Sequence, residues 1–172
     1  MNQKKVQAQV LEHAKRLTVL IDKITETSKN KNTNPTAWRI ACDDFRSQYN
    51  MLAFPGGLDE GLAALKNHDL SAIMIAIEFL KADPYYHRSG YNKKKILHLL
   101  KNAPLEPQQI NDLQDILVKS LKIKGPFYLE YCRLAYKIQD PNFRTKIEDI
   151  IAQSTDERQV RNARKMWRTM NL

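Results

Sequence analysis

Apolar residues recur at intervals of three and four through nearly every long segment of this chain. Because an α-helix turns once in about 3.6 residues, this spacing places them in a stripe along one side of a helix. One such stripe, in residues 3–27, consists of Val6, Val10, Leu11, Ala14, Leu17, Leu20, Ile21 and Ile24. The alternation of apolar and polar residues expected of half-buried strands is absent from the sequence. The spacing therefore predicts an all-α protein.

Short polar or glycine- and proline-containing breaks separate the predicted helices. The residues SKNKNTNP divide the first helix from a second over residues 35–50, which FPGG ends. Three pairs of shorter helices are predicted to follow: residues 57–67 with 70–82, 90–102 with 107–123, and 126–139 with 142–154. Asp69 and Asp140 are suited to cap the helices that they precede, and Ser154 or Thr155 to cap the last helix. The predicted core positions are Ile73, Ile77, Leu80, Ile96, Leu100, Leu113, Leu117, Leu134, Ile138, Ile147 and Ile151.

These helix pairs recur at intervals of roughly 30 to 40 residues, the period of helical-hairpin solenoids. Each pair has a short helix, a polar turn that contains Asp or Pro, and a second helix with an apolar face. In this period and pattern, residues 57–154 resemble the HEAT-like family of α-solenoids. The resemblance implies a curved array of antiparallel helices that binds proteins or nucleic acid on its concave face. We therefore expect a single all-α, HEAT-like domain over residues 1–172, with a long N-terminal helix pair in 1–56 and a basic capping helix in 155–172.

The formal net charge of +9 indicates which kinds of partner the chain can bind. A surface with this excess of lysine and arginine attracts polyanions or the acidic face of a protein. No apolar run approaches the roughly 20 residues that span a bilayer, so we expect no membrane partner. Cys42 and Cys132 each lie in an apolar helical pattern, which favours buried free thiols and a reducing, cytoplasmic environment.

Motifs for catalysis, metal binding and cofactor binding are missing from the sequence. Its histidines lie in different segments, and the HExxH, CxxC and GxSxG patterns do not occur. The glycines of PGG are followed closely by Asp59 and Glu60, which would repel a phosphate group. We therefore expect a protein with no metal and no cofactor that is not an enzyme.

Residues 83–95, DPYYHRSGYNKKK, combine three tyrosines with a histidine, an arginine and three consecutive lysines. One interpretation is a turn between two helices. Asp83 before Pro84 would end the first helix, because the residue before a proline disfavours helical angles. Tyr85 and Tyr86 would cover the helix ends with their rings, and Ser89 would cap the next helix.

A turn does not explain the cations of this segment. They would lie at or near the start of the following helix, where a positive charge opposes the helix dipole but where an anion is bound favourably. The candidate residues for binding an acidic partner or phosphate are Arg88, Lys93, Lys94 and Lys95. The candidate aromatic contacts, which could stack on bases only if their rings are exposed, are Tyr85, Tyr86 and Tyr91.

The last predicted helix, within DERQVRNARKMWRTM, has an apolar and a basic face. Its predicted apolar stripe consists of Val160, Ala163, Trp167 and Met170. Its cations follow one another at intervals of three and four, with no acidic residue after the first of them: Arg158, Arg161, Lys165 and Arg168. Such a stripe is either a solvated face that caps the array or a binding surface.

The charge and the predicted fold favour a non-enzymatic protein that docks the acidic surface of a partner protein, as an immunity, adaptor or regulatory protein does. The alternative is sequence-independent binding of nucleic acid, in which the same lysines and arginines contact phosphates. We favour a protein partner because the chain lacks a recognisable nucleic-acid-binding motif.

Overall fold

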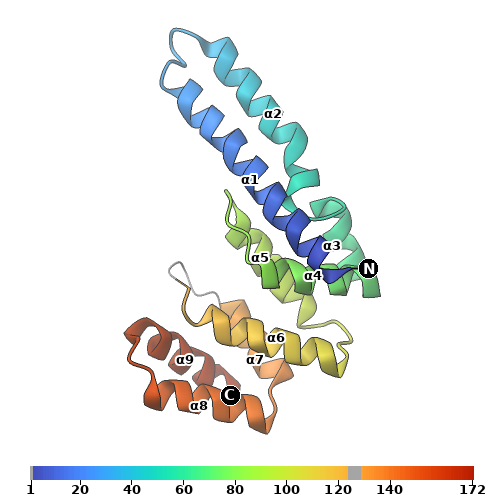
Figure 1. Cartoon of the computed structure of the whole chain (residues 1–172), viewed down its shortest axis with the longest axis vertical. Coiled ribbons are helices and arrows are strands. Elements are labelled where there is room, and N and C mark those ends of the chain that lie inside the picture. Colours follow the sequence, from blue (N-terminus) through green and yellow to red (C-terminus); the bar gives the residue numbers. More distant parts are fainter. Residues whose placement is uncertain (1, 124–128) are drawn as a thin grey trace. The chain divides into compact units, whose positions relative to one another are not determined.

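The structure is a computed structural model, which describes residues 2–123 and 129–172 (Figure 1). Those residues form α-helices joined by short turns and contain no β-strand, which confirms the prediction of an all-α protein. The helices are α1 (Gln3–Ser28), α2 (Pro35–Ala53), α3 (Leu58–Lys66), α4 (Leu70–Ala82), α5 (Ser89–Leu100), α6 (Pro107–Ser120), α7 (Leu129–Ile138), α8 (Pro141–Gln153) and α9 (Glu157–Met170). Backbone contacts group the chain into two compact units, Met1–Lys93 and Lys94–Leu172, and the boundary between them falls within α5.

In the first unit, α1 packs against both α2 and α4, and α1 and α2 run side by side (Figure 1). The buried residues of α1 recur at the intervals expected from the sequence, and they are Val6, Val10, Ala14 and Leu17. Leu11 of the predicted stripe is 45% exposed, because it lies at the edge of this buried face. Asn34 accepts a hydrogen bond from the backbone N–H of Ala37 at 3.2 Å, and Pro35 is the first residue of α2.

Two glycines shape the junction of α2 and α3: Gly57 lies in the turn and Gly61 lies within α3. Gly57 has a φ of 98°, in the left-handed region that side chains rarely adopt. A Cβ on Gly61 would lie 2.4 Å from the ring of Phe54. That ring is buried against Phe79, with the two ring centroids 5.4 Å apart. The FPGG sequence therefore ends α2, as predicted, and Gly61 lets α3 approach the ring of Phe54 closely.

In the second unit, α6 packs against α7, and α9 packs against both α7 and α8. The sequence instead paired the helices predicted over residues 126–139 and 142–154. In the described part of this unit, α7 and α8 are not among the pairs in close backbone contact. Residues 126–128 of the predicted helix lie outside the described residues, and α7 begins at Leu129.

The helix caps agree with the predictions at Asp69 and Asp140 but not at α5 or α9. Ser89, predicted to cap α5, is the first residue of that helix, and the carbonyl of Arg88 accepts its first backbone hydrogen bonds. Asp69 and Asp140 each accept a hydrogen bond from the backbone N–H three residues on, at 2.8 Å and 2.9 Å. The cap of α9 is Asp156, not Ser154 or Thr155. The Ser154 hydroxyl is engaged instead, because it donates a hydrogen bond to a side chain of α9.

All the predicted core positions are buried except Ile151, which is half-buried. On α8 the fully buried positions are Phe143 and Ile147, one turn apart. The stripes read from the sequence therefore identify the inward faces of the helices from α4 to α8.

The inward face of α9 differs from the predicted apolar stripe. Gln159 and Asn162 are buried, whereas Val160 and Trp167 are only half-buried. Asn162 is tolerated there because its Nδ2 donates a hydrogen bond of 2.9 Å to the carbonyl of Leu121. Ala163 and Met170 of the predicted stripe are buried as expected. The buried face of α9 also includes Gln159 and Asn162, which the apolar stripe left out.

Candidate binding surfaces

The cations of α9 face solvent because the opposite side of the helix is anchored in the second unit. Asp156 accepts hydrogen bonds from the backbone N–H groups of Arg158 and Gln159, at 2.9 Å and 3.2 Å, and so fixes the start of the helix. Met166 and Met170 are buried on the anchored side. The remaining positions carry the exposed cations of the helix, Arg161, Arg164, Lys165 and Arg168.

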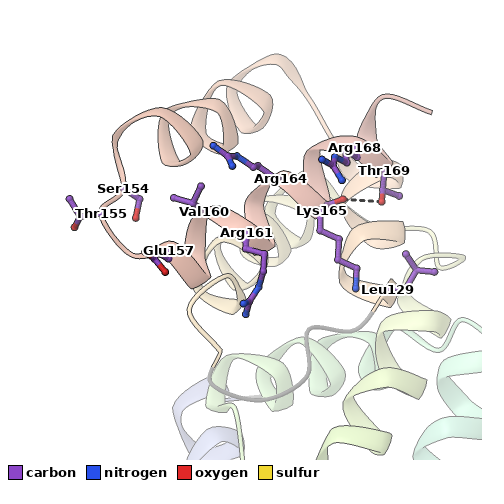
Figure 2. A pocket seen from close by; sticks show the side chains of 10 residues that line it. All are labelled: Leu129, Ser154, Thr155, Glu157, Val160, Arg161, Arg164, Lys165, Arg168 and Thr169. Carbon is purple, nitrogen blue, oxygen red and sulfur yellow. Dashed lines mark hydrogen bonds between the residues drawn. The ribbon is translucent and has the colours of Figure 1, made fainter.

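A pocket of about 790 Å³ lies beside α9 (Figure 2). This volume is within the range of roughly 300–1,000 Å³ that is usual for ligand pockets. Figure 2 shows Arg161 and Lys165 extending from one side of the helix and Arg164 from another. We call this region the α9 pocket; it is lined by Leu129, Ser154, Thr155, Glu157, Val160, Arg161, Arg164, Lys165, Arg168 and Thr169.

The α9 pocket combines a basic rim with apolar side chains. Val160 and Leu129 provide the apolar part of its lining, and Leu129 is 40% exposed. Glu157 is the one carboxylate among the described lining residues. A ligand in this pocket would therefore meet several cations and an apolar contact at once.

The arginines of the pocket are not neutralised by neighbouring acids. Arg161, Arg164 and Arg168 form no ion pair with any residue in the described ranges. Elsewhere in the same unit, cations form ion pairs with carboxylates; for example, Nζ of Lys94 lies 3.8 Å from Oε1 of Glu130. The α9 pocket therefore has unpaired positive charge available for a partner.

Three of the four cations predicted on the last helix line this pocket, namely Arg161, Lys165 and Arg168. Arg158 does not, since it is half-buried in the first turn of α9. The sequence reasoning missed Arg164, although its distances of three and four residues from Arg161 and Arg168 are the same signal. It also missed the apolar contribution of Leu129, which belongs to a different helix.

Trp167 has a role that the predicted apolar stripe did not include. The guanidinium carbon of Arg144 in α8 lies 4.8 Å from the centre of its ring, a cation–π contact. Arg144 also donates a hydrogen bond of 3.4 Å to the carbonyl of Met170. These contacts tie the end of α9 to α8 and keep Trp167 from acting as an exposed stacking surface.

In the first unit, the segment DPYYHRSGYNKKK is organised around a buried tyrosine. Tyr86 is 5% exposed, and its hydroxyl donates a hydrogen bond of 2.7 Å to the carbonyl of Ala53 at the end of α2. Nδ2 of Asn92 donates to the hydroxyls of Tyr86 and Tyr49, at 2.9 Å and 3.1 Å. Burial raises the pKa of Tyr86 well above its usual value, so the hydroxyl stays protonated and able to donate. Tyr86, predicted as a candidate aromatic contact, is therefore unavailable to a ligand.

The other two tyrosines of this segment are exposed, Tyr85 to 91% and Tyr91 to 68%. Stacking on bases requires exposed rings, and Tyr85 and Tyr91 meet this requirement. Arg88 is also exposed, with a φ of 70° and no ion pair to a described residue. Lys93 is not available, because its side chain is 12% exposed and its Nζ lies 2.5 Å from Oδ1 of Asp83.

The remaining two candidate lysines belong to the second unit. Lys94 is exposed but lies 3.8 Å from Oε1 of Glu130, while Lys95 is exposed. Glu130 is itself shared, because Arg133 lies 3.7 Å from the same oxygen. Of these two lysines, Lys95 is the one without a carboxylate partner among the residues described.

Over residues 2–123 and 129–172 no group of histidine, cysteine, aspartate and glutamate side chains could hold a metal ion. Cys132 is fully buried, and its burial raises the pKa of the thiol, which disfavours the reactive thiolate. No helix in the same ranges is long and apolar enough to cross a membrane.

Comparison of the chain with protein-family models, with curated proteins and with solved structures finds no match.

Proposed function

We propose that this chain is a non-enzymatic binding protein that docks an acidic surface of another protein through the α9 pocket. The observation that carries the proposal is the arrangement of unpaired arginines around an apolar lining, with Arg161, Arg164 and Arg168 beside Val160 and Leu129. A partner segment with carboxylates on either side of an apolar side chain complements both features.

The spacing of the cations supports a helical partner segment. Arg161 with Lys165, and Arg164 with Arg168, are pairs at i and i+4. Residues at this separation lie about 6 Å apart along a helix, since each residue rises about 1.5 Å. Carboxylates at i and i+4 of a partner helix have the same separation and can face the cations in register.

The wider architecture is part of the same proposal. We infer a HEAT-like arrangement because α3 and α4, the first of the predicted pairs, are successive helices in close contact. We also infer a cytoplasmic location, because Cys42 and Cys132 are free thiols, as expected in a reducing compartment.

Binding of nucleic acid through its phosphates is the second candidate for the α9 pocket. The observation that favours it is that Arg161, Arg164 and Arg168 have no carboxylate partner in the described ranges. A phosphate-binding surface needs cations but has no use for an apolar lining. Val160 and Leu129 therefore favour the protein partner.

The experiment compares two double charge reversals in the second unit. Arg161→Glu with Lys165→Glu changes the α9 pocket, whereas Lys119→Glu with Lys137→Glu makes the same change in charge at exposed positions outside it. Both variants should remain folded. The Lys119/Lys137 variant should melt a few degrees lower, because both lysines lie in the last turns of their helices, where the dipole favours a cation. Each is used to recover partners from a lysate of the source organism at about 150 mM salt, with and without nuclease.

We expect a partner with an acidic surface that the wild type and the Lys119/Lys137 variant recover after nuclease and that the Arg161/Lys165 variant loses. Leu129→Ala should weaken the same interaction, because the substitution removes most of the apolar side chain that the partner would contact. Recovery that disappears with nuclease and does not depend on Leu129 would establish the phosphate-binding alternative. Equal recovery by both double variants would contradict any role for the α9 pocket.

A further inference from the structure

A second exposed surface lies entirely in the first unit, where the α4–α5 turn presents aromatic and cationic side chains. Tyr85 and Tyr91 are 91% and 68% exposed, so packing within the unit explains little of either ring. His87 and Arg88 between them are exposed as well. We call these four residues the tyrosine surface. Its chemistry differs from that of the α9 pocket, whose described lining contains no aromatic ring.

The backbone beneath the tyrosine surface is held at several points. Tyr86 is fixed by its hydrogen bonds to Ala53 and Asn92, and its backbone N–H donates to Oγ of Ser89 at 3.3 Å. The ion pair of Asp83 with Lys93 joins the beginning of the turn to α5. Side chains on a fixed backbone lose less conformational freedom on binding, which is the property of an aromatic recognition surface.

Arg88 is the residue that local structure explains least. Its carbonyl accepts hydrogen bonds from the backbone N–H groups of Tyr91 and Asn92, at 3.0 Å and 3.2 Å, so it occupies the capping position of α5. Asn, Asp, Ser and Thr are favoured at such a position, and a cation there opposes the helix dipole. Its φ of 70° lies in the left-handed region, which arginine rarely adopts.

The other non-glycine residues with left-handed backbone in the described ranges have a structural explanation. His68 follows the last turn of α3, where its backbone N–H donates to the carbonyl of Leu65 at 3.1 Å. Asp83 is the residue that ends α4. Arg88 stands instead at the beginning of a helix, so its presence there indicates a use for its exposed side chain.

We propose that the tyrosine surface binds a single strand of nucleic acid, with unpaired bases stacked on Tyr85 and Tyr91 and a phosphate bound by Arg88. The acid of this segment does not oppose a phosphate, because Asp83 is neutralised by Lys93. Exposed rings beside cations are the combination that single-strand binders use, and a base in a duplex cannot reach such a ring. Tyrosine and arginine are also common in protein interfaces, so the test below includes a protein partner as an outcome that contradicts the proposal.

The test measures binding of labelled single strands of about 16 nucleotides, oligo-dT and oligo-U, by fluorescence anisotropy at about 50 and 150 mM salt. Tyr85→Ala and Tyr91→Ala should each weaken binding roughly 5- to 150-fold, the loss of one stacked base. Tyr85→Phe should bind like the wild type, because phenylalanine keeps the stacking ring. Tyr136→Ala removes a tyrosine that is 51% exposed in the second unit and should have no effect.

Further measurements decide between the alternatives. Inorganic polyphosphate has no bases, so its affinity should be unchanged by Tyr85→Ala and reduced by Arg88→Gln. The Arg161/Lys165 reversal should leave oligonucleotide affinity within about twofold under screening salt, which separates this surface from the α9 pocket. Wild-type affinity of Tyr85→Ala and Tyr91→Ala for both strands would overturn the proposal. So would a nuclease-resistant protein partner that is lost on the same two substitutions while oligonucleotides fail to bind.

Discussion

Replacing Tyr86 by phenylalanine should destabilise the first unit by about 1–3 kcal/mol. The Tyr86 hydroxyl is buried, donates to the carbonyl of Ala53 at 2.7 Å and accepts from Nδ2 of Asn92 at 2.9 Å. Phenylalanine keeps the ring in place but removes both hydrogen bonds. One net hydrogen bond contributes about 1 kcal/mol, and a buried group left without a partner costs about 1–3 kcal/mol. Asn92 keeps Tyr49 as a partner, so the carbonyl of Ala53 accounts for most of the loss.

The chain offers a matched control at the neighbouring position. Tyr85→Phe removes the same hydroxyl from a side chain that is 91% exposed, where water is the partner in both the folded and unfolded chain. This change should alter stability by less than about 0.5 kcal/mol. The difference between the two variants isolates the buried hydrogen bonds, because the atoms removed are the same.

Urea unfolding followed by tryptophan fluorescence can measure this difference in one unit. The chain has two tryptophans, Trp38 in α2 and Trp167 in α9. In a Trp167→Phe background, Trp38 reports on the first unit alone. With a slope of about 1–2 kcal/mol/M, Tyr86→Phe should lower the midpoint by about 1 M and leave the slope unchanged. Equal midpoints for Tyr86→Phe and Tyr85→Phe would refute the assigned hydrogen bonds.

Three other substitutions test separate features of the structure. Nδ1 of His13 has no hydrogen-bond partner among the described residues, and burial, then the nearby charge of Arg16, lowers the pKa of His13. As the pH falls, the His13 imidazole is therefore protonated in the unfolded chain before it is protonated in the folded one. The free energy of unfolding should decrease below about pH 6.5 for this reason. His13→Gln should remove that part of the pH dependence in urea unfolding. Ile147→Ala should lower the free energy of unfolding by roughly 2–5 kcal/mol and the half-buried Ile151→Ala by less, while equal losses would contradict the inward face of α8. Arg88→Asn should raise stability by about 1 kcal/mol, because asparagine tolerates left-handed backbone and caps helices, and should weaken oligonucleotide binding in anisotropy.

The helices and most of the core could be predicted from the sequence because their signals are local. Asp69 and Asp140 cap helices through the N–H groups three residues ahead, and the apolar stripes of α4 to α8 repeat within one or two turns. On α9 the predicted stripe included the buried Ala163 and Met170 but missed Gln159 and Asn162, because these two residues are polar. They are buried only because partners elsewhere satisfy them, such as the carbonyl of Leu121 for Asn162. That information is not contained in a hydrophobic period.

The exposure of the tyrosines could not be predicted, because Tyr85 and Tyr86 are identical residues at adjacent positions. Their opposite environments depend on Ala53 and Asn92, which lie 33 and 6 residues from Tyr86 in the sequence. The sequence indicated cations along α9, because these residues share one helix, but it did not indicate a pocket. The apolar side of the pocket could not be predicted, because Leu129 comes from another helix whose position depends on the packing of the whole unit.

Local energetic costs gather at the two proposed binding surfaces. On α9, Arg161 with Lys165 and Arg164 with Arg168 are like-charge pairs at i and i+4, each destabilising by roughly 0.2–0.5 kcal/mol. In the first unit, a left-handed conformation at Arg88 costs roughly 1–2 kcal/mol. Neither cost is offset by an ion pair that the described residues supply to these arginines.

A sequence that served stability alone would avoid these costs with common substitutions, such as glutamate in place of one arginine on α9 or asparagine in place of Arg88. Stability and binding are therefore expected to change in opposite directions at these positions, whereas they change together at buried ones such as Tyr86. This opposition distinguishes a binding surface from a merely solvated face, where removing a like-charge pair would raise stability and leave every interaction unchanged. A variant that became more stable and kept its full affinity would show that the cost at that position has no functional basis.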